Sequence, residues 1–263
     1  ESLYGALVAG TLLAAYRLHA APSLGRAAVL GLLSGLAALT RGEAVLLPVL
    51  LVLPLLRRPP GLRIAVVALA AMAVVLAPWT IRNAVTFHRL VPVSTDAGAA
   101  IGGANCQPTY YGDNIGGWNI LCDPDYPGNE AVQTAHQQSR AVGYARAHVG
   151  RLPVVAAARL LRQWSFLHPF QANPGRSAIV QKIGVIVYWA LLPLAAYGLL
   201  VLRRRRAPTW IIVTPLLLAC VQAVIVYGFL RFRHPAEISL VVLAGVGLEA
   251  LWRRRTAPRP QPA

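Results

Sequence analysis

Charged residues are scarce in this 263-residue sequence, at 13% of the chain against about 25% in an ordinary soluble domain. This scarcity argues against a water-soluble globule, and the 56% hydrophobic content argues against disorder. Acidic residues are the scarcest, with nine against 24 arginines and one lysine. Because the arginines lie in clusters between long apolar runs, we expect a multi-pass membrane protein and no nucleic-acid partner.

The motifs of soluble enzymes are also missing. The sequence has no phosphate-binding P-loop, no Cys-x-x-Cys pair and no His-Glu-x-x-His helix, and its six histidines are scattered. The glycines of Gly98–Gly103 do not join a strand to a helix, so we expect a flexible or closely packed loop there. No cofactor or metal site is therefore predicted, and a requirement for a divalent metal stays open.

Long apolar runs dominate the sequence and predict an all-α fold of membrane-spanning helices. A spanning helix needs about 20 mostly apolar residues. Ser2–Tyr16 resembles part of a span, and Ala27–Leu56 is interrupted by Thr40–Glu43, which predicts two short helices meeting at a polar turn. Four further runs predict spans: Leu62–Trp79, Ile179–Leu202, Trp210–Leu230 and Ala236–Trp252.

The basic clusters predict an orientation, because cytoplasmic loops are enriched in Lys and Arg. Placing Arg57-Arg58, Arg203–Arg206 and Arg253–Arg255 in the cytoplasm gives one consistent path through a bacterial plasma membrane. On this path, residues 1–80 are membrane helices, incomplete at their N-terminus and broken at 40–43. Residues 81–178 form an extracytoplasmic loop subdomain, 179–252 three more spans, and 253–263 a cytoplasmic tail.

The predicted outer segment contains two helical stretches. Asn129 is a suitable N-cap for a helix running to about His148, with Glu130 in its first turn. Pro153 suits the first turn of a second helix, Pro153–Leu167, whose apolar and Arg positions suggest an interfacial helix. Both helices follow a Pro- and Gly-containing turn at 123–128, so short helices and loops are expected here.

Two of the three cysteines lie in this outer segment. We expect Cys106 and Cys122 to form a disulfide, which the chain-entropy model values at about 3 kcal/mol. Two free thiols or a metal site are the alternatives, although a metal site lacks a further Cys or His at ligand spacing. Cys220 lies in a predicted span and reads as a small buried apolar residue.

Polar residues at the outer membrane boundary are the candidate site, because ionisable groups there are costly to bury. The three segments that return to this face are Thr40–Glu43, Pro78–Asn83 and Arg231–Glu237. Arg is suited to phosphate because its planar fork donates two hydrogen bonds. Ion pairing within the protein and anchoring at the lipid interface are the alternative roles. We expect Arg41, Arg82 and Arg231 to converge on one phosphate. The candidate substrate-binding residues are Arg41, Glu43, Arg82, Asn83, Arg231, Arg233, His234 and Glu237.

The same segments carry a family resemblance. Gly31-Leu-Leu-Ser-Gly-Leu-Ala-Ala-Leu-Thr-Arg-Gly-Glu43 and Ala77-Pro-Trp-Thr-Ile-Arg-Asn83, followed by Leu90–Thr95, are similar to polytopic glycosyltransferases of the C superfamily. More narrowly, they resemble bacterial members of the dolichyl-phosphate-mannose protein mannosyltransferase and aminoarabinose transferase group. Arg231-Phe-Arg-His-Pro-Ala-Glu237 resembles the family's late Arg-Tyr-Arg-x-Pro element. Gly103–Gly112, continuing to Cys122, looks like an outer-loop insert of actinobacterial-type members.

The resemblance implies transfer of a sugar from a polyprenyl-phosphate carrier to an extracytoplasmic acceptor. The family's catalytic acidic residues lie in the first outer loop, which nothing here matches, so we expect this chain to be a C-terminal fragment, inactive alone. The implied partners are the carrier-linked sugar and the lipid bilayer, and the acceptor stays open. A transporter or flippase for lipid-linked sugars and a non-catalytic membrane assembly protein are the alternatives.

Overall fold

The computed structural model describes residues 1–57, 59–122, 124, 126–170 and 177–256. These residues form eleven α-helices and six short 3₁₀ helices, and none of them lies in a strand. The predicted all-α fold is therefore confirmed for the described chain. Arg58, Asp123 and Asp125 of the predicted cluster and turn, and residues 257–263 of the predicted tail, lie outside the described residues.

The first group of helices is built around a close approach of α2 and α4. A Cβ at Gly31 would lie 2.0 Å from the carbonyl oxygen of Ala68, so only glycine allows the two helices this contact. The helix α2 ends before Arg41, which is extended, as the polar interruption predicted. The elements are α1 (Ser2–Ala20), α2 (Leu24–Thr40), η1 (Gly42–Val45), α3 (Leu46–Val52), η2 (Leu53–Arg57) and α4 (Gly61–Phe87).

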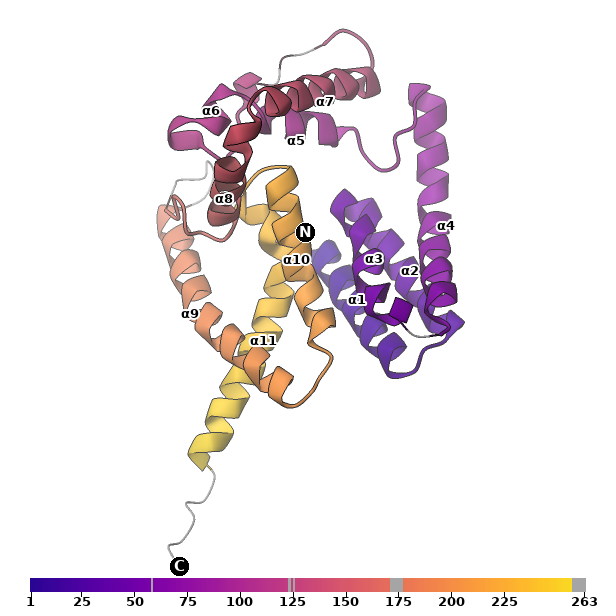
Figure 1. Cartoon of the computed structure of the whole chain (residues 1–263), viewed down its shortest axis with the longest axis vertical. Coiled ribbons are helices and arrows are strands. Elements are labelled where there is room, and N and C mark those ends of the chain that lie inside the picture. The colour runs from indigo at the N-terminus through magenta and orange to yellow at the C-terminus, as the bar shows by residue number, and fades with distance from the viewer. Residues whose placement is uncertain (58, 123, 125, 171–176, 257–263) are drawn as a thin grey trace, which may run out of the picture.

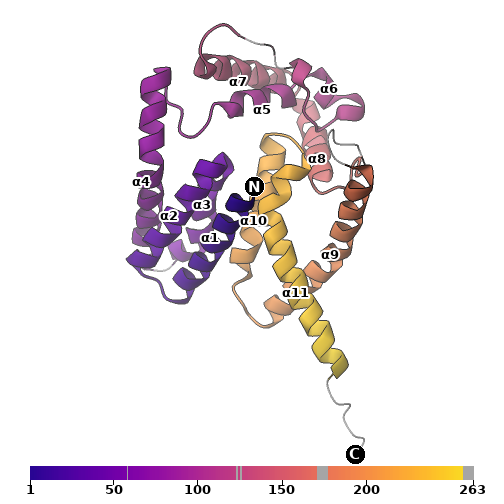
Figure 2. The same cartoon turned by 180° about the vertical axis from the view of Figure 1, so that it is seen from behind.

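The last group of helices crosses through two glycines. A Cβ at Gly198 would lie 1.9 Å from the carbonyl oxygen of Leu243, and one at Gly247 would lie 2.3 Å from that of Leu194. The elements are α9 (Ala178–Arg204), α10 (Thr209–Ile225), η6 (Leu230–Arg233) and α11 (His234–Thr256). Figures 1 and 2 show α9 and α11 crossing and then separating toward the C-terminal end of α11.

Three helical segments are long and apolar enough to cross a membrane: Gly61–Phe87, Ala178–Arg204 and Leu230–Thr256. The span expected over Trp210–Leu230 is shorter than predicted, because α10 ends at Ile225 after 17 residues. The chain leaves the helix there so that Gly228 can pack on α8. A Cβ at Gly228 would lie 2.1 Å from the carbonyl oxygen of Arg159.

In the sequence, a helical subdomain separates these two groups. It is built from α5 (Asp96–Ala104), α6 (Gln107–Tyr110), α7 (Glu130–Ala147) and α8 (Leu152–Gln163). The predicted Asn129 cap is present, since its side chain accepts a hydrogen bond from the Val132 amide at 3.0 Å. The segment Gly98–Gly103 is helical rather than a loop, and it is closely packed, because a Cβ at Gly98 would lie 2.5 Å from Thr134 Cα.

The α8 helix is shorter than expected and ends at Gln163 instead of Leu167. Ser165 takes a left-handed conformation, with φ of 59°, which stops the helix. Its hydroxyl then accepts a hydrogen bond from Nη1 of Arg233 at 3.0 Å. The early helix end therefore places a polar contact between the subdomain and η6.

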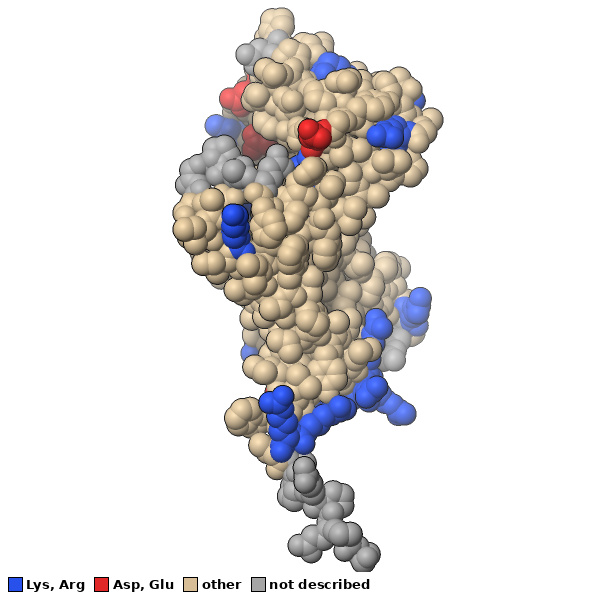
Figure 3. Space-filling view, turned by 90° about the vertical axis from the view of Figure 1, so that its left-hand side faces the viewer, with Lys and Arg blue, Asp and Glu red and all other residues tan. Residues whose placement is uncertain are grey.

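The two ends of the molecule differ in composition. In Figures 1 and 2 the subdomain lies at one end, while the α1–α2, α3–α4 and α9–α10 connections and the end of α11 lie at the other. On the face drawn in Figure 3, basic side chains gather at that second end without acidic ones. The described basic residues there are Arg17, Arg26, Arg57, Arg63, Arg203, Arg204, Arg205, Arg206, Arg253, Arg254 and Arg255.

Candidate functional site

Two of the three predicted polar segments meet beside the start of α1. Arg41 Nη1 lies 3.5 Å and Arg231 Nε 3.6 Å from the same carboxylate oxygen of Glu1. Both guanidinium groups also lie over the ring of Phe232, at 5.1 and 5.8 Å from its centroid. The break after α2 and the turn before α11, far apart in the sequence, are thus joined around one carboxylate. We call Glu1, Arg41 and Arg231 the shared-carboxylate cluster.

Arg41 is the more constrained of the two arginines. Its Nε donates a hydrogen bond to Glu43 at 2.6 Å, and its side chain is only 13% exposed. The ring of Tyr4 lies on it as well, at 5.6 Å from Cζ. Arg231, in contrast, has a side chain that is 59% exposed and no second carboxylate partner within the described chain. Arg231 is therefore the cation of this cluster with the most freedom to contact a ligand.

Arg233 and its neighbours hold the fold together at this end. Arg233 donates to Glu237 at 3.1 Å and to Ser165 at 3.0 Å, and its Cζ lies 3.6 Å from the centre of the Tyr188 ring. His234 lies 3.2 Å from the backbone carbonyl of Glu1 and 3.8 Å from Glu237. Arg233 is buried, and its contacts with Glu237, Ser165 and Tyr188 leave it little capacity to bind a ligand.

Arg82 and Asn83 make no described contact with the shared-carboxylate cluster. Arg82 donates to Asn83 at 3.0 Å and lies 5.2 Å from the centre of the Trp79 ring, and its described contacts go no further. Asn83 is buried and donates to the carbonyls of Val91 and Val93, which folds the chain back on α4. Arg41 and Arg231 thus share one carboxylate, and no described contact joins Arg82 to either of them. Convergence of the three arginines on one phosphate stays a prediction.

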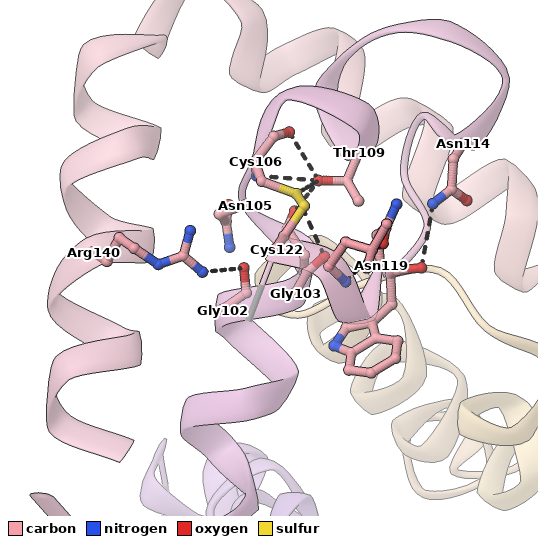
Figure 4. Close-up of a disulfide and its surroundings, with 12 residues drawn as sticks. Gly102, Gly103, Asn105, Cys106, Thr109, Asn114, Asn119, Cys122 and Arg140 are labelled. Carbon is pink, nitrogen blue, oxygen red and sulfur yellow. Dashed lines mark hydrogen bonds between the residues drawn. A yellow bond between two sulfur atoms is a disulfide. The ribbon is translucent and has the colours of Figure 1, made fainter. Parts of the chain in front are cut away.

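The disulfide predicted between Cys106 and Cys122 is present, with the two Cα atoms 6.0 Å apart. It joins the start of α6 to the loop that follows, and Figure 4 shows Thr109 folded against it. The Thr109 hydroxyl donates to the carbonyl of Ala104 at 2.9 Å. Arg140 reaches from α7 to the carbonyl of Gly102 at the end of α5 (Figure 4). The disulfide thus closes the most irregular part of the subdomain.

Sequence reasoning missed Arg159, the cation that ties the subdomain to α10. Its side chain is buried, and it donates to the Val224 carbonyl at 2.8 Å, the Ala104 carbonyl at 2.8 Å and Asn105 Oδ1 at 3.1 Å. Burial lowers the pKa of its guanidinium below the ordinary value, and the same burial raises the pKa of Tyr110 beside it. Gln163, one turn later, donates to the Ala219 carbonyl at 2.7 Å. In the sequence, Arg159 and Gln163 are an i, i+4 pair of polar residues on an apolar helix. This pattern was the signal that could have indicated the contact with α10.

Within the described residues, no group of three His, Cys, Asp or Glu side chains could hold a metal ion. Cys220 is a free, partly buried cysteine. The sequence matches no protein-family model, no curated protein and no solved structure at a significant level.

Proposed function

We propose that this chain is the carrier-binding part of a membrane glycosyltransferase that moves a sugar from a polyprenyl phosphate to an extracytoplasmic acceptor. The supporting observation is the Glu1 carboxylate between Arg41 and Arg231. An anion already forms ion pairs with both guanidinium groups, and a phosphate can form the same ion pairs. In the proposed complex, the phosphate of the carrier replaces this carboxylate.

The proposal places α4, α9 and α11 across a bacterial plasma membrane. The clustered arginines at one end of the molecule favour that end as cytoplasmic. The subdomain with Cys106 and Cys122 then lies outside, where disulfides persist. The shared-carboxylate cluster lies toward the subdomain end, which suits an acceptor outside the membrane.

The proposed chemistry uses charge that grows during the reaction. A sugar-linked carrier phosphate is a diester, and its leaving-group oxygen gains negative charge as the glycosidic bond breaks. Arg231 is the arginine that we propose contacts this oxygen, because its side chain is 59% exposed and its contact with Glu1 is long, at 3.6 Å. The proposed reaction also needs a general base on the acceptor hydroxyl.

The test is transfer of labelled sugar from carrier lipid to acceptor in membranes, using the complete natural protein and normalising to folded protein. R231A is expected to lower the rate about 10²–10³-fold, and R231K to restore only part of it. R89A removes an exposed arginine after α4 that contacts none of the described candidate residues, and it should leave transfer unchanged.

Two further variants sharpen the test. E1Q removes the carboxylate that competes for Arg41 and Arg231, so it should lower the apparent KM for the carrier. R82A should cost much less than R231A, since Arg82 contacts only Trp79 and Asn83 among the described residues. Transfer by R231A at the rate of R89A would overturn the proposed function.

A further inference from the structure

The crossing of α9 and α11 leaves a cavity at the end opposite the subdomain. The helices touch at Gly198 and Gly247, where neither position has room for a Cβ. Beyond this contact the two helices separate and border a cavity of about 360 Å³ that is open to the surface. Its lining residues are Tyr197, Val201, Arg204, Arg205, Ala250, Arg253 and Arg254. We call it the arginine cavity.

The arginine cavity has an excess of positive charge. Four arginines line it, and the nearest acid is Glu249, which lies 2.7 Å from Arg253 and 3.8 Å from Arg205. Arg204 and Arg254 have no acidic partner in the described part of the chain. Glu249 therefore pairs with two of the four guanidinium groups and leaves the other two without a carboxylate.

Tyr197, which lines the cavity, also has an unsatisfied polar atom. The hydroxyl of Tyr197 is buried and makes no hydrogen bond to any described residue. Arg254 lies on the ring, with its Cζ 5.7 Å from the centroid. Because buried hydroxyls nearly always have a partner, an oxygen-bearing ligand between the arginines would satisfy this one.

We propose that the arginine cavity binds the phosphate of an anionic phospholipid. Arginine is suited to phosphate oxygens, and the Tyr197 hydroxyl supplies a neutral donor to the same group. Exposed apolar side chains, including Leu200, Leu248 and Trp252, lie close in sequence to the arginines on both helices and offer contacts for acyl chains. The proposal rests on the membrane placement given above and is independent of the transferase activity.

Native mass spectrometry of the full chain in neutral detergent tests this proposal, with phosphatidylglycerol and phosphatidylcholine as probes. Phosphatidylglycerol should bind more tightly than phosphatidylcholine. R204Q/R254Q should weaken phosphatidylglycerol binding at least about tenfold more than R203Q/R255Q, since only the first variant removes charged hydrogen-bond donors from the cavity. The two variants are matched, because each removes one charge from α9 and one from α11.

Y197F changes no charge and should weaken phosphatidylglycerol binding about fivefold through loss of one hydrogen bond. Because Y197F removes only one atom, we expect it to fold like the wild type. It therefore still tests the cavity if the arginine variants misfold. Equal losses in the two arginine pairs, together with wild-type binding by Y197F, would assign the effect to general surface charge and overturn the proposal. Displacement of the lipid by equimolar inorganic phosphate would also overturn it, because the site would then select free phosphate.

Discussion

Replacing Arg159 should detach the subdomain from α10. Its guanidinium donates to two carbonyls that lie at the ends of helices, Ala104 in α5 and Val224 in α10. A cation near the C-terminal ends of helices interacts favourably with their dipoles. R159M keeps most of the side-chain length and loses every donor, so both carbonyls and Asn105 Oδ1 each lose one hydrogen bond. The Ala104 carbonyl and Asn105 Oδ1 keep their hydrogen bonds from Thr109 and Tyr110.

The magnitude follows from the number of hydrogen bonds. A hydrogen bond to a charged group contributes about 1.5–3 kcal/mol net, and Arg159 makes three. Part of that gain offsets the cost of burying a charge, which is several kcal/mol for an ion without a carboxylate partner. The difference leaves an expected loss of about 2–4 kcal/mol. R159K keeps the charge but cannot span all three acceptors, so it should fall between R159M and wild type.

Thermal unfolding in detergent, with hydrogen exchange as a local readout, would measure this effect. R146M is the matched control, because Arg146 is an exposed arginine on α7 with no contact to the Arg159 acceptors. Faster exchange at the backbone amides around Asn105 and Val224 should accompany the loss of stability in R159M. A melting temperature within the error of R146M, with unchanged exchange, would refute the reasoning.

Two smaller predictions concern the same subdomain. G228A should destabilise the protein by about 1–3 kcal/mol, because the added Cβ would lie 2.1 Å from the Arg159 carbonyl. The control is G143A, because a Cβ at this position in α7 meets nothing within 4 Å. G143A should be neutral or stabilising by about 0.5–1 kcal/mol. Equal shifts of the melting temperature in G228A and G143A would contradict the packing argument. C106S/C122S should lose about 3 kcal/mol in denaturant unfolding, and a reductant should shift wild type but leave the double variant unchanged.

Much of the fold could be predicted from local patterns. Apolar runs marked α4, α9 and α11, because span length and composition are local properties. The Asn129 cap and the break at Arg41 were also readable, since each depends on a few adjacent residues. The end of α10 was not, because Gly228 leaves the helix to meet Arg159, a contact with another part of the chain.

The candidate site was readable only in part, for the same physical reason. Polar residues at the ends of apolar runs identified Arg41 and Arg231, and the fold brings these together. The role of Glu1 could not be read from the sequence, because a carboxylate beside two arginines is a tertiary arrangement. The helix that contains Arg159 was predicted to be interfacial, whereas Arg159 is buried and hydrogen-bonded to α5 and α10.

The charge balance of the shared-carboxylate cluster bears on how the proposed transferase would work. Glu1 and Glu43 together already compensate Arg41 and Arg231, so a singly charged carrier diester gains little by replacing the Glu1 carboxylate. As the glycosidic bond breaks, the leaving phosphate becomes a monoester with additional negative charge, and it then competes with Glu1 more strongly. Interactions that strengthen only toward the transition state raise the rate without tightening ground-state binding. Under the proposed function, the internal carboxylate therefore favours turnover over retention of the carrier.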